Sequence, residues 1–153
     1  MDKAGEVVVR EMLPEDAAVV ANLTGQLGYP STEADIKRRY DLISGRPDSC
    51  LLVAQRAGRG VVGWIQVQEA QLLEADLRAE IWGLVVAESV RGTGVGRLLV
   101  EAVEAWAVAR GLDVIAVRSN VVRLGAHAFY EHLGYRVIKT QNADAAQNRI
   151  VAI

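Results

Sequence analysis

Residues 85–97 read Val85-Val86-Ala87-Glu88-Ser89-Val90-Arg91-Gly92-Thr93-Gly94-Val95-Gly96-Arg97, and this stretch decides the fold. An apolar run ends at Val86, and three glycines at alternate positions then lead into an amphipathic segment. Glycine lets the backbone approach a ligand with no Cβ in the way. The unpaired N–H groups of a helix's first turn carry partial positive charge. With Arg91 and Arg97 beside them, the stretch predicts a phosphate-binding turn between a strand and a helix.

Two familiar phosphate loops do not fit this turn. A nucleoside-triphosphate loop needs Gly-x-x-x-x-Gly-Lys-Ser/Thr, and the chain has no such run. The dinucleotide fingerprint Gly-x-Gly-x-x-Gly would place its third glycine on Arg97 or Leu99. An NAD-dependent oxidoreductase is therefore the weaker hypothesis, and binding of NAD would support it.

The hydrophobic pattern predicts an α/β (α+β) fold with a mixed, mostly antiparallel central sheet and helices on both faces. Serial strands imply antiparallel hairpins, whereas a strand-helix-strand unit implies one parallel pair. Residues 68–78 are polar and are predicted as a turn or an exposed segment. The predicted strands are 7–10, 51–54, 61–67, 80–86, 113–118 and 135–140, and the predicted helices are 14–28, 32–45, 94–110 and 122–133. Thr32 and Asp35 resemble a capping box at the start of the second helix, and Gly28, Gly111 and Gly134 are predicted to end the other three. Leu98 belongs to the predicted apolar stripe of the third helix.

Composition places the chain among single globular domains, here residues 7–153. The chain has 153 residues and a formal net charge of -2, which gives no electrostatic footprint for nucleic acid. No apolar run approaches the roughly 20 residues that span a bilayer, so no membrane association is expected. A single cysteine, Cys50, favours a reducing compartment and hence a cytoplasmic protein. The two histidines, five residues apart on a predicted helix, are poorly spaced for a metal site, and none is expected.

Two motifs resemble those of the GNAT superfamily of acetyl-CoA-dependent N-acetyltransferases. The segment 91–97 looks like the family's Arg/Gln-x-x-Gly-x-Gly/Ala signature. The segment 119–135 contains Asn120, Ala126, Phe129-Tyr130 and Leu133-Gly134-Tyr135, and is similar to the family's second signature. The two motifs occur in the family's order, and the close likeness covers about residues 80–135. The resemblance implies a GNAT fold in which a parallel strand pair, 80–86 and 113–118, splays apart to admit the cofactor.

The resemblance also implies which residues bind acetyl-CoA. The glycine-rich turn would bind the pyrophosphate, the strand before it would pair with the pantetheine arm, and Gly83 as a bulge would suit the splay. A side chain in the second motif would bond the same arm, and an aromatic ring would line the cofactor's exit path. The implied cofactor-binding residues are Leu84, Val85, Val86, Arg91, Gly92, Thr93, Gly94, Val95, Gly96, Arg97, Asn120 and Phe129.

Catalysis would be direct attack of an amine on the thioester in a ternary complex. The resemblance implies that Tyr130 is the acid that protonates the departing thiolate, and a packed tyrosine with no chemical role is the alternative. Glu80 matches a base that acts through water, and an exposed strand-end glutamate is equally consistent with the sequence. Trp82 and Tyr29 are candidate acceptor contacts, against a core tryptophan and a turn tyrosine. The acceptor is expected to be a small cationic amine or a peptide amine.

A non-catalytic acyl-CoA-binding regulatory module is the alternative function. Such a module would keep the turn at 91–97 and lose the acid and base, yet Tyr130 and Glu80 are both present. The C-terminal segment Asn142–Ile153 departs from the family, because residues 142–148 are polar and alanine-rich and only 149–153 suit a strand. The sequence therefore leaves open how the C-terminal edge closes and whether the chain forms a homodimer.

Overall fold

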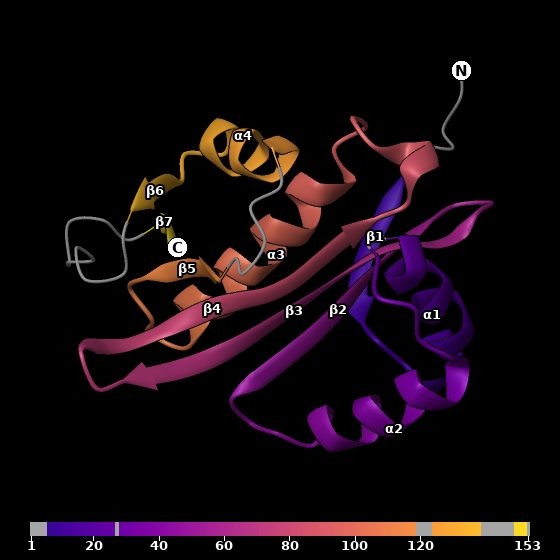
Figure 1. Cartoon of the computed structure of the whole chain (residues 1–153), viewed down its shortest axis with the longest axis horizontal. Helices are drawn as coiled ribbons and strands as arrows, with labels where there is room; N and C mark the ends of the chain where they lie inside the picture. Colours follow the sequence, from indigo (N-terminus) through magenta and orange to yellow (C-terminus); the bar gives the residue numbers. More distant parts are fainter. Residues whose placement is uncertain (1–5, 27, 119–123, 139–148, 153) are drawn as a thin grey trace. The chain divides into compact units, whose positions relative to one another are not determined.

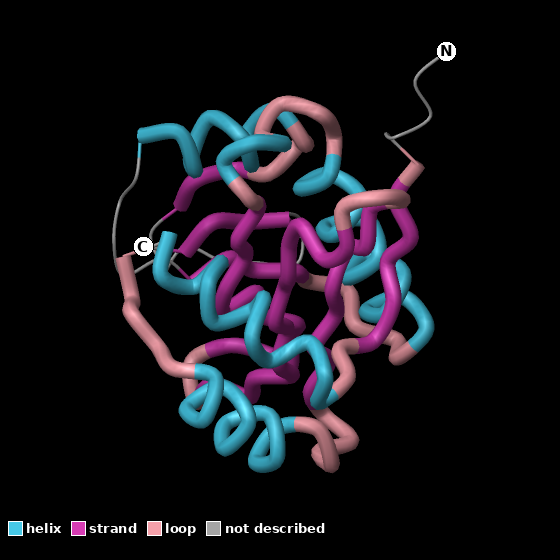
Figure 2. Tube along the Cα trace, turned by 90° about the vertical axis from the view of Figure 1, so that its right-hand side faces the viewer, coloured by secondary structure: helices cyan, strands magenta, loops and turns pink. Residues whose placement is uncertain are grey.

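The structure, a computed structural model, describes residues 6–26, 28–118, 124–138 and 149–152 (Figure 1). Figure 2 traces the same segments by type of secondary structure. Along the chain they are β1 (Val7–Glu11), η1 (Pro14–Asp16), α1 (Ala17–Gln26), α2 (Glu33–Ile43), β2 (Ser49–Arg56), β3 (Gly60–Leu72), β4 (Ala75–Val86), η2 (Glu88–Val90), α3 (Val95–Ala109), β5 (Ile115–Arg118), α4 (Leu124–His132), β6 (Arg136–Ile138) and β7 (Arg149–Ala152).

The strands form one mixed sheet, as the sequence predicts. Their order is β1-β2-β3-β4-β5-β7-β6. Strands β1 and β2 are antiparallel, with Val7 opposite Arg56 and Glu11 opposite Leu52. Strands β4 and β5 are parallel and pair from Ala79↔Ile115 to Ile81↔Val117, which confirms the parallel pair expected of a strand-helix-strand unit.

The C-terminal strands contain more parallel pairing than the sequence predicts. Strand β7 pairs in parallel with β5 and with β6. A strand is present at Arg149–Ala152, in the part of the segment that suits one, whereas the polar residues 142–148 before it lie outside the described residues. Whether a strand runs parallel or antiparallel to its neighbour depends on the segment that connects the two. The local hydrophobic pattern therefore predicts the strand but not its orientation.

The prediction of a turn over residues 68–78 is wrong, whereas the alternative of an exposed segment holds for part of this stretch. Strand β3 continues to Leu72 and β4 begins at Ala75, which leaves Leu73 and Glu74 as the turn. The polar residues of this segment belong to a long hairpin. Polar side chains are compatible with a strand when they lie on a face that is not packed. The early part of β4 that was missed contains Arg78, which is buried.

The predicted helix ends at Gly28, Gly111 and Gly134 are confirmed. The backbone φ angles there are 99°, 74° and 95°, a left-handed conformation that glycine adopts without steric cost. At the end of α4 the N–H of Tyr135 donates to the C=O of Tyr130 at 3.0 Å, the long bond of a Schellman motif. These local signals fix where α1, α3 and α4 stop.

The predicted capping box at the start of α2 is also present. The hydroxyl of Thr32 accepts a hydrogen bond from the Asp35 N–H at 3.0 Å, and the Asp35 carboxylate accepts one from the Thr32 N–H at 3.0 Å. These bonds lower the pKa of Asp35, because they favour the charged carboxylate. The box begins α2 at Glu33, which fixes the length of the turn that carries Tyr29.

The chain forms two compact units, residues Met1–Gln66 with Gly83–Ala102, and Val67–Trp82 with Val103–Ile153. The first unit has a core built from β1, α1, α2 and the neighbouring strands: Met12, Ala17, Val20, Ala21, Leu23, Ile36, Val53, Val61 and Val85. In the second unit the buried apolar residues come from β3 to β5 and the ends of α3 and α4: Val67, Ala79, Ile81, Val103, Ala107, Leu112, Ile115, Ala116, Val117, Tyr130 and Tyr135. Among the described residues, each helix is too short or too polar to cross a membrane.

Gly83 makes room for an indole ring. A Cβ added at Gly83 would lie 2.7 and 2.8 Å from the Cη2 and Cζ3 atoms of Trp64, closer than atoms can pack. Glycine inside a strand often marks a bulge or a close approach, and here the close approach is the side chain of Trp64. This packing accounts for a glycine in the middle of β4 without reference to a ligand.

We therefore expect Gly83→Ala to lower the free energy of unfolding by about 1–3 kcal/mol, the usual cost of overpacking. Urea denaturation of purified protein measures this change. Gly25→Ala is the matched control, because a Cβ at Gly25 meets nothing within 4 Å and alanine favours a helix. Equal stabilities of Gly83→Ala and wild type would contradict the proposed contact with Trp64.

Candidate active site

The glycine-rich turn between β4 and α3 has the predicted form. Gly92 and Gly94 have φ angles of 81° and 94°, which L-amino acids rarely adopt. A Cβ added at either position would meet no atom within 4 Å, so these glycines are not needed to fit the surrounding protein. Their conformation turns the backbone into α3, and the space beside it is open.

The first turn of α3 presents backbone N–H donors. The bond from the Leu98 N–H to the Gly94 C=O, 3.1 Å long, opens the helix. The N–H groups of Val95, Gly96 and Arg97 therefore precede the helical ladder, at the positive end of the helix dipole. The side chain of Val95 is 2% exposed and anchors this turn, so these donors are held in place.

Side chains from two other segments hold the start of the turn. The Arg59 Nη2 group donates to the Ser89 Oγ at 2.8 Å. The Gln26 Oε1 atom accepts from the Glu88 N–H at 3.2 Å. The Arg91 Nε group donates to the Val86 C=O at 3.3 Å. No pattern in the sequence indicated Gln26 or Arg59, because hydrogen bonds between distant segments leave no local pattern.

Strand β4 extends beyond its pairing with β5. Among the described residues that pairing ends at Ile81↔Val117, whereas β4 continues to Val86. The segment Leu84–Val86 contains the predicted pantetheine contacts, and the Val85 side chain is 2% exposed. Where a strand extends beyond its neighbour, that neighbour does not pair with its backbone N–H and C=O groups. An extended ligand can form hydrogen bonds with these groups.

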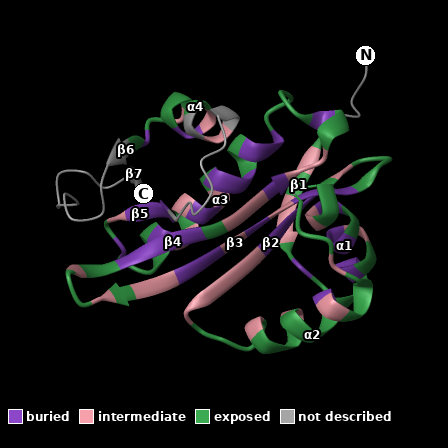
Figure 3. Cartoon of the chain, viewed as in Figure 1, coloured by how far each residue is buried: buried purple, intermediate pink, exposed green. Residues whose placement is uncertain are grey.

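Glu80 is buried in a hydrogen-bonded group with Arg78 and Trp82. The Arg78 Nε and Nη2 groups donate to the Glu80 Oε2 atom at 3.0 and 2.9 Å. The Trp82 Nε1 group donates to the Glu80 Oε1 atom at 2.9 Å. Glu80 is 1% exposed. Figure 3 colours part of β4 as buried. The alternative of an exposed strand-end glutamate does not describe this side chain.

Trp82 lies at the exposed end of the same row. Residues 78, 80 and 82 alternate along β4, so their side chains share one face of the strand. Trp82 is 45% exposed, in contrast to the buried Arg78 and Glu80. Its indole is therefore not a core tryptophan, and it connects the buried ion pair to the surface.

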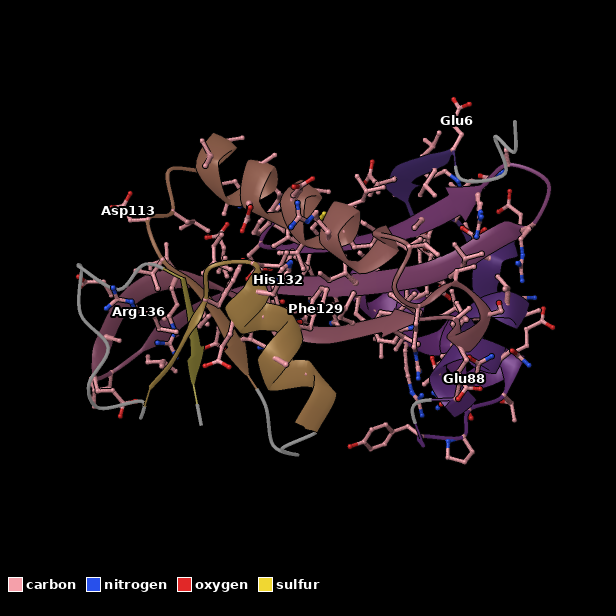
Figure 4. All side chains as sticks on the ribbon, turned by 90° about the horizontal axis from the view of Figure 1, so that it is seen from above. Glu6, Glu88, Asp113, Phe129, His132 and Arg136 are labelled. Carbon is pink, nitrogen blue, oxygen red and sulfur yellow. The ribbon has the colours of Figure 1, made fainter. Side chains whose placement is uncertain are left out.

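Tyr130 lies on α4 within a group of aromatic rings. Its ring packs edge-on against Phe129 at a centroid distance of 5.0 Å and against Tyr135 at 5.5 Å. Figure 4 labels Phe129 and His132 on this helix. Tyr130 is 5% exposed, and its hydroxyl has no hydrogen-bond partner among the described residues. The Tyr135 hydroxyl, in contrast, donates to Glu104 at 2.9 Å.

Burial raises the pKa of Tyr130 well above its ordinary value of 10, because the phenolate would lose its hydration. The folded state therefore holds this proton more tightly than the unfolded state does. The corresponding stability is fully present below about pH 10 and is lost as the pH rises toward the folded-state pKa.

We predict that the stability difference between wild type and Tyr130→Phe is constant from pH 7 to 9. Above about pH 10, wild type should lose roughly 1.4 kcal/mol per pH unit relative to the variant. Guanidinium denaturation of both proteins in a series of buffers measures the difference. Parallel pH dependence of the two proteins up to pH 11.5 would show that Tyr130 is not shielded from water.

The structure brings some of the predicted site residues together. Glu80 and Trp82 are hydrogen-bonded, Phe129 and Tyr130 are in contact, and Leu84 to Arg97 form a continuous strand-turn-helix segment. Tyr29 is 54% exposed in the turn between α1 and α2. Asn120 lies outside the described residues. No cluster of three or more His, Cys, Asp or Glu side chains suited to a metal ion occurs in the described part of the chain.

The family profile "Acetyltransferase (GNAT) family" matches residues 17–135. The chain belongs to the GNAT acetyltransferase family. The match covers β4, the glycine-rich turn and α4, so the predicted resemblance is confirmed.

Individual proteins are also similar to this chain. Human N-acetylaspartate synthetase is 32% identical over 103 residues, which cover 67% of this chain and 32% of that protein. The chain thus spans about a third of the length of the synthetases that it matches. A structure described as a transcriptional regulator from Bacillus halodurans C-125 is 26% identical with a TM-score of 0.74, and the match covers 86% of this chain and 93% of that one.

A further solved structure shares the fold alone. It is AAC(6′)-Iy in complex with the bisubstrate analogue CoA-S-monomethyl-acetylneamine, 18% identical with a TM-score of 0.74. The match covers 86% of this chain and 91% of that chain. This chain and that protein therefore share the arrangement of strands and helices.

Proposed function

We propose that this protein transfers the acetyl group of acetyl-CoA to an amine. The observation that carries the proposal is the continuous segment 82–97. In this segment β4 extends beyond the residues that pair with β5, and a glycine-rich turn then leads into the first turn of α3. This segment offers strand-edge groups for an extended arm and helix N–H donors for a pyrophosphate. Family membership supports the same assignment.

Acetyl-CoA is proposed to bind along this segment. The pyrophosphate would accept hydrogen bonds from the N–H groups of residues 92–97, with Arg91 and Arg97 balancing its charge. The pantetheine arm would pair with Leu84–Val86 as an added strand does. Asn120 and Phe129 remain the proposed contacts from the second motif.

The reaction is attack of a neutral amine on the thioester carbonyl. The carbon–nitrogen bond forms, and the oxyanion of the tetrahedral intermediate accepts a hydrogen bond from the Val85 N–H. The carbon–sulfur bond then breaks, and the electron pair leaves on the CoA sulfur. Tyr130 is proposed to protonate that sulfur. Burial that raises the pKa of the phenol also raises that of a thiolate in the same surroundings, so the proton transfer stays feasible.

Glu80 is proposed to receive the proton that the attacking amine loses, through water. An alkyl ammonium has a pKa near 10.4, so a neutral amine is scarce at pH 7 and a proton acceptor helps. The bonds from Arg78 and Trp82 hold the Glu80 carboxylate in one orientation. A fixed carboxylate can orient both the ammonium group and a water molecule, which a freely rotating one cannot.

Three classes of amine are proposed as acceptors: small cationic amines, peptide amines and amino acids. Trp82 is the exposed aromatic surface beside Glu80, and Tyr29 is a second candidate contact. Amino acids are included among the proposed acceptors because the curated relatives are named for the synthesis of N-acetylaspartate. Glu74 and Asp76 are exposed near the β3–β4 turn, where they can attract cations.

The cytoplasm is the proposed location, since a chain with a single cysteine suits a reducing compartment. A homodimer remains a proposal that sedimentation would test.

An amine panel with acetyl-CoA, monitored by release of free thiol, tests the activity. Thiol release that depends on the amine supports N-acetyl transfer. Thermal shifts with acetyl-CoA and with NAD accompany the panel. Stabilisation by acetyl-CoA without turnover of any amine would favour the regulatory-module alternative, and stabilisation by NAD alone would overturn both.

A further inference from the structure

In the buried ion pair on β4, one edge of the arginine guanidinium does not take part in the pairing. Arg78 is 3% exposed and Glu80 is 1% exposed. Arg78 donates from Nε and Nη2, and both hydrogen bonds end on one oxygen, Glu80 Oε2. The other oxygen, Oε1, accepts from Trp82. The pairing thus uses one edge of the guanidinium.

The opposite edge of the guanidinium has no acceptor. The Arg78 Nη1 atom is buried, and it has no hydrogen-bond partner among the described residues. A guanidinium is a planar fork, and its Nη1 and Nη2 groups together match the two oxygens of a carboxylate. A buried charged donor without an acceptor carries a desolvation penalty, which an incoming anion would remove.

Charge balance restricts which anion can bind here. Arg78 and Glu80 together are neutral, so a simple carboxylate or a simple ammonium would leave a net charge in a buried place. An amino acid carries both a carboxylate and an ammonium group, so its binding adds no net charge. Its carboxylate can accept from Arg78 while its ammonium lies toward the Glu80 carboxylate.

We propose that Arg78 binds the carboxylate of an amino-acid acceptor and thereby selects amino acids over other amines. The inference rests on the proposed acetyl transfer and narrows its acceptor. Trp82, at the exposed end of the row, is the side chain past which the acceptor reaches the ion pair. Arg78 is a specificity residue. Tyr130 remains the group that is proposed to protonate the CoA sulfur.

The experiment compares the standard amino acids with their carboxamides, which keep the amine and lose the negative charge. In wild type we expect kcat/KM for the preferred amino acid to exceed that for its carboxamide by roughly 10- to 100-fold, the worth of a charge-assisted hydrogen bond. In Arg78→Lys the cation that neutralises Glu80 remains and the fork is lost. The preference should then fall to a few-fold or less through a higher KM for the amino acid.

Arg110→Lys is the matched control. Arg110 pairs with Glu69 and stacks over Trp106 at 4.8 Å, so it resembles Arg78 in chemistry but is not part of the β4 row. This variant should keep the wild-type preference for amino acids. If Arg78→Lys does not fold, the neutral pair Arg78→Met with Glu80→Gln replaces it in a binding assay, in which the thermal shift by the amino acid should disappear.

Equal use of acids and carboxamides by wild type would overturn the inference, and so would a preference that Arg78→Lys retains. A water molecule would then be the partner of Nη1. Failure of the proposed function has a different signature: no amine releases thiol from acetyl-CoA. In that case thermal shifts still decide the inference, which stands only if wild type binds the amino acid and Arg78→Lys does not.

Discussion

Tyr130→Phe should lower kcat by roughly 100- to 10,000-fold, the usual contribution of a positioned general acid. The ring of Tyr130 packs against Phe129 and Tyr135, and phenylalanine keeps both contacts. The hydroxyl has no hydrogen-bond partner among the described residues, so its removal should cost little stability. The KM for acetyl-CoA should change little. Steady-state thiol release at saturating amine measures the effect.

Tyr135→Phe is the control for this prediction. It removes a hydroxyl five residues away that donates to Glu104 at 2.9 Å. We expect a loss of about 1 kcal/mol in stability and no comparable loss in kcat. Equal loss of activity in the two variants would mean that the loss does not come from a specific acid at Tyr130. Wild-type turnover by Tyr130→Phe at every pH would remove Tyr130 from the mechanism.

Local rules account for the parts of the fold that the sequence predicted. A glycine at the end of an apolar stripe predicts a left-handed cap, and Gly28, Gly111 and Gly134 provide it. Thr32 and Asp35 form the capping box by contacts within one helical turn. In these cases the interacting groups are neighbours in the chain, so the pattern contains the whole cause.

The parts that failed depend on distant residues. In the helix after the glycine turn, Leu98 belongs to the predicted apolar stripe but is 39% exposed, because burial depends on what covers each face. The outer part of the β3–β4 hairpin was missed, because its polar residues resemble a turn or an exposed segment. Their partners across the sheet are separated from them in sequence, and a pattern read along the chain does not reveal them.

The candidate site shows the same division. The glycine turn and the Phe129-Tyr130 pair are short motifs, and a sequence can reveal them. Arg78 is an arginine in a polar stretch, and charged side chains are usually exposed. Its burial follows from the extension of β4 and from pairing with Glu80, which only the structure shows.

Gly94→Ala should weaken acetyl-CoA binding by roughly 10- to 100-fold, through loss of charge-assisted hydrogen bonds to phosphate. Gly94 has a φ angle of 94°, and alanine would strain or shift the backbone there. A shift of the turn misaligns the N–H groups of the first helical turn. Because no protein atom lies within 4 Å of the added Cβ, the methyl group would occupy the space proposed for the ligand. Calorimetric titration with acetyl-CoA measures the affinity.

Gly111→Ala separates this effect from strain alone. Gly111 has a φ angle of 74°, and a Cβ there also meets nothing within 4 Å. Both variants should therefore lose about 1 kcal/mol or more in stability. Only Gly94→Ala should lose affinity, since Gly111 ends α3 and Gly94 precedes its first turn. If the two variants bind acetyl-CoA equally well, the phosphates do not lie on this turn, and the pyrophosphate must be sought elsewhere on the chain.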